Sequence, residues 1–190
     1  MSRFFWVRHG PTHAKAMVGW SDLPADLSDT AQLSRLSGLL PRDALVISSD
    51  LIRASATADV IAAGRERLPH DPDLREIHFG DWELARFDEV EDQHRLRAYW
   101  EAPGDIRPPG GESWHDVTAR VDRAVARLLN IRPARDIVVV AHFGVILPHV
   151  QPALRLGAYE AFSHRIDNLS GTELHRRGEG WQALRINHLP

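Results

Sequence analysis

The sequence predicts an α/β fold with three layers, αβα, built on an open and mostly parallel sheet with an antiparallel hairpin at one edge. Short apolar runs without polar alternation occur along the chain, which is typical of parallel strands covered on both faces. Amphipathic helical stretches separate these runs. Towards the end of the printed sequence, two strand-like segments flank Gly178-Glu179-Gly180, which indicates a hairpin.

Four apolar runs are predicted as strands: residues 4–7, residues 45–48, a weaker run around Leu74, and residues 137–141. The last run is rich in β-branched residues, as buried strands are. Because helical patterns lie between the runs, the chain predicts right-handed βαβ units. The hairpin is predicted over residues 172–175 and 181–187.

The first two helices are predicted from apolar spacing and end signals. A helix after the N-cap candidate Ser28 places leucines on one face, at Leu33, Leu36, Leu39 and Leu40. A second, alanine-rich helix covers residues 51–63 and stops at Gly64.

Two further helices are predicted in the second half of the chain. One begins with Ser113 and Asp116, which resemble a capping box, and continues as an apolar stripe to Leu129. The other covers residues 145–156, with Pro148 in its first turn, where proline is tolerated.

One stretch fits neither pattern. Residues 78–112 are polar, rich in tryptophan and arginine, and end in Pro-Gly and Pro-Pro-Gly-Gly sequences. We predict a single domain over residues 1–190, with this stretch as an insertion or lid over one end of the sheet. Lid candidates are Trp82, Arg95, Arg97, Tyr99 and Trp100. The alternative is that the aromatic residues pack the insertion down and the arginines are solvated.

Composition excludes several classes of function. The net charge of −3 and the pI near 6.4 argue against a general nucleic-acid-binding protein. The absence of cysteine excludes disulfides, thiolate zinc sites and cysteine-based phosphatase chemistry. No apolar run approaches the ~20 residues that span a bilayer, and no signal-peptide pattern opens the chain. We therefore expect a soluble, cytoplasmic protein with no membrane partner; the oligomeric state is not predicted.

Chemically active side chains follow each predicted strand. Arg8 and His9 follow the first, Arg53 the second, Glu76 the third and His142 the fourth. Because ligands bind beyond the carboxyl ends of strands in open α/β sheets, these side chains are expected to meet. Arginines bind phosphate bidentately, and phosphoryl transfer depends mainly on positioning and electrostatics. The set therefore predicts phosphoryl transfer.

The predicted roles follow from ordinary chemistry. Neutral imidazole is a nucleophile near neutral pH, so His9 is the expected phosphate acceptor, and Gly10 allows close approach of substrate. Glu76 is the expected proton donor to the leaving oxygen. The phosphate charge would be stabilised by Arg8, Arg53 and a protonated His142, the role that Mg²⁺ has in other phosphoryl-transfer enzymes. Backbone N–H groups at Phe143 and Gly144 would add to the anion site.

Five sequence motifs then occur in order over nearly the whole chain. They are Arg8-His9-Gly10 with Thr12, Ser48 to Ala54 with Thr57-Ala58, Leu74-Arg75-Glu76 with Phe79 to Glu83, Gly110 to Ser113, and Ala141-His142-Phe143-Gly144. With these motifs the chain resembles the histidine phosphatase superfamily, branch 1, the phosphoglycerate mutase-like group that includes α-ribazole phosphatases. The resemblance implies the phosphoglycerate mutase-like fold.

The resemblance also implies roles for individual residues. His9 would become phosphohistidine, Glu76 would donate the proton, and the phosphate pocket would consist of Arg8, Arg53 and His142. We add four residues to the predicted substrate-binding or phosphate-binding set: Thr12, Lys15, Trp20 and Phe143. Lys15 stands where many members have Asn, and Phe143 where many have Gly. No cofactor and no metal is implied.

The predicted function is that of a metal-independent, histidine acid phosphatase-type phosphomonoesterase, a hydrolase acting on a small phosphorylated metabolite. One alternative is phosphoglycerate mutase-type transfer, although mutases resemble longer chains with a larger insertion and a C-terminal tail over the site. Another alternative is a weakly active member that binds a phosphorylated ligand. The sequence does not name the substrate, and sugar phosphates, nucleotides, α-ribazole phosphate and phosphoproteins all stay open.

Overall fold

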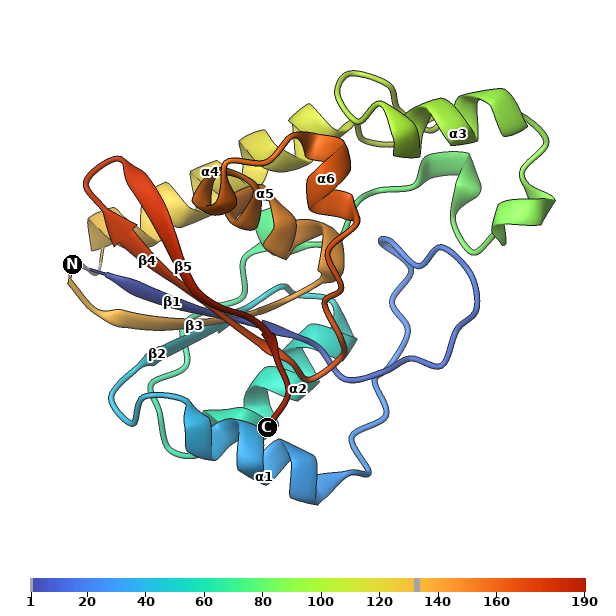
Figure 1. Ribbon diagram of the computed structural model, residues 1–190. Helices are drawn as coiled ribbons and strands as arrows, with labels where there is room; N and C mark the ends of the chain where they lie inside the picture. Colours follow the sequence, from blue (N-terminus) through green and yellow to red (C-terminus); the bar gives the residue numbers. More distant parts are fainter. Residues whose placement is uncertain (1, 132–133) are drawn as a thin grey trace.

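The computed structural model describes residues 2–131 and 134–190, and its centre is a five-stranded sheet. The strand order is β2-β3-β1-β4-β5 (Figure 1). β1 runs parallel to β3, and β3 parallel to β2, whereas β4 is antiparallel to both of its neighbours. The predicted αβα fold with its antiparallel edge hairpin is confirmed. The strands are β1 (Arg3–Arg8), β2 (Leu45–Ser48), β3 (Asp136–Ala141), β4 (Gly171–Arg177) and β5 (Gly180–His188).

Helices cover both faces of the sheet (Figure 1). Two lie on one face, α1 (Thr30–Leu39) and α2 (Ile52–Ala62). Three lie on the other, α4 (Trp114–Ile131), α5 (Phe143–Leu154) and α6 (Ala158–Phe162). This arrangement forms the two outer layers that the uninterrupted apolar strands require.

Side-chain alternation in β1 divides the core in two. Phe4 and Trp6 pack in the cluster that includes the buried side chains of α4 and α5. Phe5 and Val7 pack in the cluster that includes those of α1 and α2. Since successive side chains of a strand point to opposite faces, both sets must be apolar. The carboxyl end of β1 is thereby held between two packed layers.

Four local predictions are wrong. The run around Leu74 is not a strand but a short 3₁₀ helix, η1 (Pro72–Leu74), because Pro72 lacks the N–H that a strand ladder needs and Asp71 caps the turn. The side chain of Asp29, not Ser28, accepts the capping bond of α1, and Leu39 is half exposed. α5 begins at Phe143, so Pro148 lies in its second turn rather than its first.

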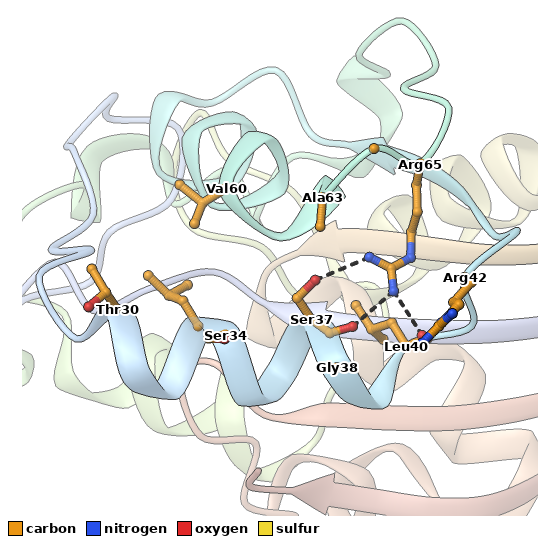
Figure 2. A pocket seen from close by; sticks show the side chains of 11 residues that line it. Thr30, Ser34, Ser37, Gly38, Leu40, Arg42, Val60, Ala63 and Arg65 are labelled. Carbon is orange, nitrogen blue, oxygen red and sulfur yellow. Dashed lines mark hydrogen bonds between the residues drawn. The ribbon is translucent and has the colours of Figure 1, made fainter.

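A cavity of about 640 Å³ opens between α1 and α2 near the ends of both helices (Figure 2). Arg65 points its guanidinium group at main-chain oxygens there. Its nitrogens donate to the carbonyl oxygens of Pro41 at 2.7 Å, Leu40 at 2.8 Å and Ser37 at 2.9 Å. It also donates to two carbonyl oxygens of α2. Helix ends leave carbonyl oxygens without partners, and Arg65 satisfies them for both helices.

The predicted insertion extends beyond the carboxyl ends of the parallel strands (Figure 1). It contains η2 (Gly80–Trp82), η3 (Phe87–Glu89) and α3 (Gln93–Glu101). Trp82 and Tyr99 are buried against each other, with ring centroids 5.7 Å apart. The two lid arginines, at positions 95 and 97, are exposed. Trp82 and Tyr99 therefore pack this segment down and its two predicted lid arginines are solvated, whereas Trp100 lines a cavity of about 310 Å³.

No helix in the described part of the chain is both long enough and apolar enough to cross a membrane.

Candidate active site

His9 lies one residue past the end of β1. Its main chain is fixed by a hydrogen bond from its N–H to the Ala141 carbonyl oxygen at 3.1 Å, and by the amide of Asn168, which donates to the His9 carbonyl oxygen at 2.8 Å. Its imidazole Nδ1 lies 2.6 Å from the Gly10 carbonyl oxygen. Because a carbonyl oxygen only accepts, Nδ1 carries the proton and Nε2 keeps its lone pair. The ring is therefore set as a nucleophile through Nε2.

Arg53, in the first turn of α2, faces that nitrogen. Its Nη atoms donate to the carbonyl oxygens of Gly19 at 2.5 Å and Ser21 at 2.8 Å, which fix the plane of the guanidinium group. Its Nε lies 3.3 Å from His9 Nε2. A second link runs through Thr57, whose hydroxyl donates to the Arg53 carbonyl oxygen and accepts the N–H of Gly10. The nucleophile loop and α2 thus form one rigid unit.

His142 and Arg8 complete the cationic side of the site. The imidazole rings of His9 and His142 have centroids 4.9 Å apart, and His142 is fully buried. Neither ring nitrogen of His142 has a hydrogen-bond partner among the described residues, nor does Nε of Arg8. Arg8 is held through Nη1 by the carbonyl oxygen of Ile166 at 2.6 Å. Buried polar atoms without partners are costly, so these atoms are suited to a ligand's oxygens.

Burial sets the charge of both histidines. It lowers the pKa of His9 to about 3, with the nearby Arg53 cation as the next cause. It also holds the pKa of His142 well below its ordinary value, with His9 next to it as the second cause. The surrounding protein therefore favours the neutral form of both rings, so the predicted protonated form of His142 requires a bound anion. A phosphate dianion beside His142 would favour its protonated form.

Glu76 lies in the loop that follows η1. It does not follow a strand, contrary to the prediction from sequence. Its Oε1 accepts N–H groups of Ile77 at 2.9 Å and Gly144 at 3.0 Å, while Oε2 has only a 3.3 Å contact, to Gly144. A Cβ at Gly144 would lie 2.5 Å from Oε1, so only glycine permits this approach. Burial raises the pKa of Glu76. Because the carboxyl group takes up the Gly144 N–H, that N–H is not the phosphate ligand we predicted.

Sequence reasoning missed Arg120, which fixes the Glu76 loop. Its guanidinium group donates to the carbonyl oxygens of Asp73, Arg75 and Glu76 at 2.6–2.9 Å and pairs with the Glu112 carboxylate. A signal was present: Arg120 lies on the same face of its helix as the apolar stripe, where a solvated arginine is not expected. Thr57 belongs to the second sequence motif but was given no role, and Asn168 was missed because a sequence gives no signal for its long-range contact.

The four added binding residues lie in different places. Thr12 and Phe143 line a cavity of about 310 Å³ together with Arg8 and His9. Lys15 is exposed, and it is not one of the described residues that line this cavity. Trp20 does not line it either.

Trp20 instead holds the Glu76 loop. Its indole N–H donates to the Glu76 carbonyl oxygen at 2.8 Å, and the Arg75 guanidinium group stacks over its ring at 4.8 Å. Trp20 therefore contacts the main chain of the predicted proton donor.

The side chains of this cavity suit phosphoryl transfer. The 310 Å³ cavity brings together a neutral imidazole, two arginines and a buried carboxyl group, at His9, Arg8, Arg53 and Glu76. No histidine or carboxylate is among the described residues that line the larger cavity between α1 and α2. Within residues 2–131 and 134–190, no three histidine, aspartate or glutamate side chains gather in an arrangement that could hold a metal ion.

The family model described as "Histidine phosphatase superfamily (branch 1)" matches residues 4–189. Among curated proteins, the chain is 30% identical over 174 residues to the adenosylcobalamin/alpha-ribazole phosphatase of Salmonella typhimurium, covering 87% of this chain and 86% of that protein. It is 29% identical over 193 residues to the probable phosphoglycerate mutase GpmB of Serratia proteamaculans, covering 96% and 89%.

Solved structures of related proteins have the same fold. Bacillus stearothermophilus YhfR superposes with a TM-score of 0.90 at 25% identity, covering 100% of this chain and 98% of that one. The mycobacterial glucosyl-3-phosphoglycerate phosphatase in complex with VO3 superposes with a TM-score of 0.83 at 30% identity, covering 98% of both chains.

Proposed function

The chain belongs to branch 1 of the histidine phosphatase superfamily, and we propose that it hydrolyses a phosphomonoester through a phosphohistidine at His9, with Glu76 as proton donor. Its relatives are phosphatases and mutases, which supports a hydrolase of the phosphatase kind. The observation that carries the proposal is the 2.6 Å contact between His9 Nδ1 and the Gly10 carbonyl oxygen. The Gly10 carbonyl oxygen holds Nδ1–H, so the Nε2 lone pair faces the arginine-lined cavity.

In the first step, the phosphate dianion displaces the long Arg53–His9 contact and takes donors from Arg8, Arg53 and His142. The Nε2 lone pair of His9 forms the N–P bond while the P–O bond to the leaving group breaks. The proton of the Glu76 carboxyl group moves to the leaving oxygen, so that an alcohol departs. Oε2 is the oxygen suited to carry that proton, because Oε1 accepts two shorter hydrogen bonds.

In the second step, a water oxygen attacks phosphorus and gives a proton to the Glu76 carboxylate. The N–P bond breaks, inorganic phosphate leaves, and both His9 and the protonated Glu76 are restored. The arginines and His142 stabilise the phosphoryl oxygens in both steps. The net reaction consumes one water and one ester and yields one alcohol and one phosphate. Because Glu76 must start protonated, we propose an acid phosphatase-type enzyme.

Mutase-type transfer is the second candidate, and the 29% identity to a probable phosphoglycerate mutase is the observation that favours it. Offering 3-phosphoglycerate with 2,3-bisphosphoglycerate separates the two. We expect at most slow release of inorganic phosphate and no interconversion of the phosphoglycerates, whereas interconversion with little release would establish the mutase.

The direct test is to trap the intermediate. The protein is mixed with a ³²P-labelled ester and quenched in alkaline detergent, since the N–P bond is labile to acid. We expect label on the wild-type protein and none on His9→Ala. The matched control is His94→Ala, which removes an exposed histidine of α3 and should keep the label. Label that persists in His9→Ala would overturn the proposal.

A further inference from the structure

The catalytic cavity has an aromatic wall, which we define as Phe79, Phe87, Trp100 and Phe143. Phe79 and Phe87 both contact Trp100, with ring centroids 6.1 Å and 5.7 Å apart. Phe143 joins the group through Phe162, which contacts both Phe143 and Trp100. The aromatic wall therefore combines three side chains of the segment 78–112 with one from the start of α5, and Phe162 behind them connects the two parts.

The aromatic wall adjoins the phosphate-binding groups. The Arg8 guanidinium group lies 5.8 Å from the centroid of the Phe143 ring. A phosphate held by Arg8 and Arg53 would therefore direct its ester oxygen into a cavity whose wall is aromatic. The leaving group of the substrate is the part that would contact it.

Beyond the residues assigned to the phosphate and to proton transfer, no charged side chain among the described residues that line the cavity could pair with an ionised leaving group. Among the described residues that line it, the basic ones are Arg8 and Arg53, which the phosphate occupies, and the acidic one is Glu76. Ala14 and Ala16 line the cavity, whereas Lys15 between them is exposed and does not. Since an ionised group buried without a partner is strongly disfavoured, a second phosphate or a carboxylate fits poorly.

Phe87 shows that the aromatic wall is more than core packing. Its side chain belongs to the 3₁₀ turn η3 and is 54% exposed, so the fold gains little from it. It nevertheless lines the catalytic cavity. A large apolar side chain that is half exposed and also lines a cavity is available to contact a ligand there.

We propose that the substrate is a phosphate monoester whose leaving group is uncharged and carries an aromatic ring, which packs on the aromatic wall during hydrolysis. This inference rests on the proposed phosphatase activity and adds the substrate class. Aromatic rings attract one another in offset or edge-to-face contacts beyond the burial of their area, so a ring is favoured over an aliphatic chain.

The test compares esters of alcohols with similar leaving ability. We expect kcat/KM for 2-phenylethyl phosphate to exceed that for glycerol 1-phosphate and for 3-phosphoglycerate by about tenfold or more, mainly through KM. Phe87→Ala should reduce this ratio about fivefold. The matched control is Tyr159→Ala, which removes an aromatic side chain of similar exposure, 59%, that does not line the cavity. The control should keep the wild-type ratio.

Binding without turnover gives the second measurement. We expect phenylphosphonate to bind at least about tenfold more tightly than methylphosphonate by calorimetry, and Phe87→Ala to narrow that difference. Equal binding of the two phosphonates, or a preference for 3-phosphoglycerate, would overturn the inference. If label is trapped on His9 but no aromatic preference is found, this inference fails alone. If no label is trapped but phenylphosphonate is preferred, the proposed chemistry fails alone.

Discussion

The catalytic cavity and the cavity between α1 and α2 are both lined by an arginine from the α2 region, yet the two guanidinium groups differ in what they contact. Arg65 donates only to main-chain carbonyl oxygens and a serine hydroxyl, and these acceptors use all three of its nitrogens. Arg53 uses two nitrogens in this way, but its Nε points at His9. Arg53 is also fully buried, whereas Arg65 is only partly buried. An arginine that is buried and still has a nitrogen directed at a cavity therefore indicates ligand binding better than one whose nitrogens all donate to the protein.

Matched arginine-to-lysine variants give the largest expected effects. Arg53→Lys keeps the positive charge but loses the planar fork, so kcat/KM for any phosphate ester should fall about 1,000-fold. Arg65→Lys should leave kcat/KM unchanged. It should lower the free energy of unfolding by about 2 kcal/mol, or the melting temperature by roughly 6 °C, because helix-end carbonyl oxygens lose their donors.

Steady-state kinetics and thermal melts of both variants separate these outcomes. Both variants should lose stability, because Arg53 also donates to two main-chain carbonyl oxygens, but only Arg53→Lys should lose activity. Comparable losses of activity in both variants would show that the contacts of an arginine do not distinguish binding from structure in this protein.

The sequence predicted the parts of the site that sit at strand ends and missed those fixed by long-range contacts. His9 and His142 follow strands whose apolar runs are unmistakable, so their meeting at one sheet edge could be foreseen. Glu76 was assigned to the right place for the wrong reason, because Arg120 and Trp20 position its loop and no strand does. The exposure of Lys15 was not predictable, since a loop without periodicity does not indicate which side chains face a cavity.

Glu76→Gln tests the carboxyl group of the catalytic cavity. Gln can accept the same N–H groups but cannot donate a proton, so kcat for an alkyl phosphate should fall about 100-fold. The loss for p-nitrophenyl phosphate should be smaller, because that leaving group departs without protonation.

The pH dependence gives a second signature of Glu76. The protonated form is the active one, so wild-type kcat should fall as pH rises through its pKa. Burial raises the pKa of Glu76, and the fall should therefore come at higher pH than for an ordinary carboxyl group. In Glu76→Gln this alkaline limb should be lost for the alkyl ester. An equal loss on both esters, or a retained alkaline limb, would remove Glu76 from the role of proton donor.

His149 is another buried histidine, and it differs from His142 in its surroundings. It is 2% exposed, and its Nε2 has no hydrogen-bond partner among the described residues, while its Nδ1 lies 3.7 Å from a carboxylate oxygen of Asp122. Its ring, however, lies between the Trp6 and Trp181 rings, at 5.5 Å and 4.7 Å, rather than between arginines beside a cavity. We therefore expect it to affect stability and not catalysis.

Burial lowers the pKa of His149 to about 4 from the ordinary 6.5. Between these values the unfolded chain binds the proton and the folded chain does not, so the free energy of unfolding falls as pH decreases through this window and His149 adds no further loss below it. Replacement by phenylalanine removes this contribution of His149 to the pH dependence of the free energy of unfolding. Between pH 7 and pH 5, denaturant titrations should show His149→Phe losing about 2 kcal/mol less than wild type, with kcat/KM unchanged, while exposed His94→Phe loses as much as wild type. The change with pH is the measure, because a poorer fit of the ring lowers stability equally at both pH values. A large drop in kcat/KM would show instead that this buried histidine contributes to catalysis despite its distance from the arginines of the site.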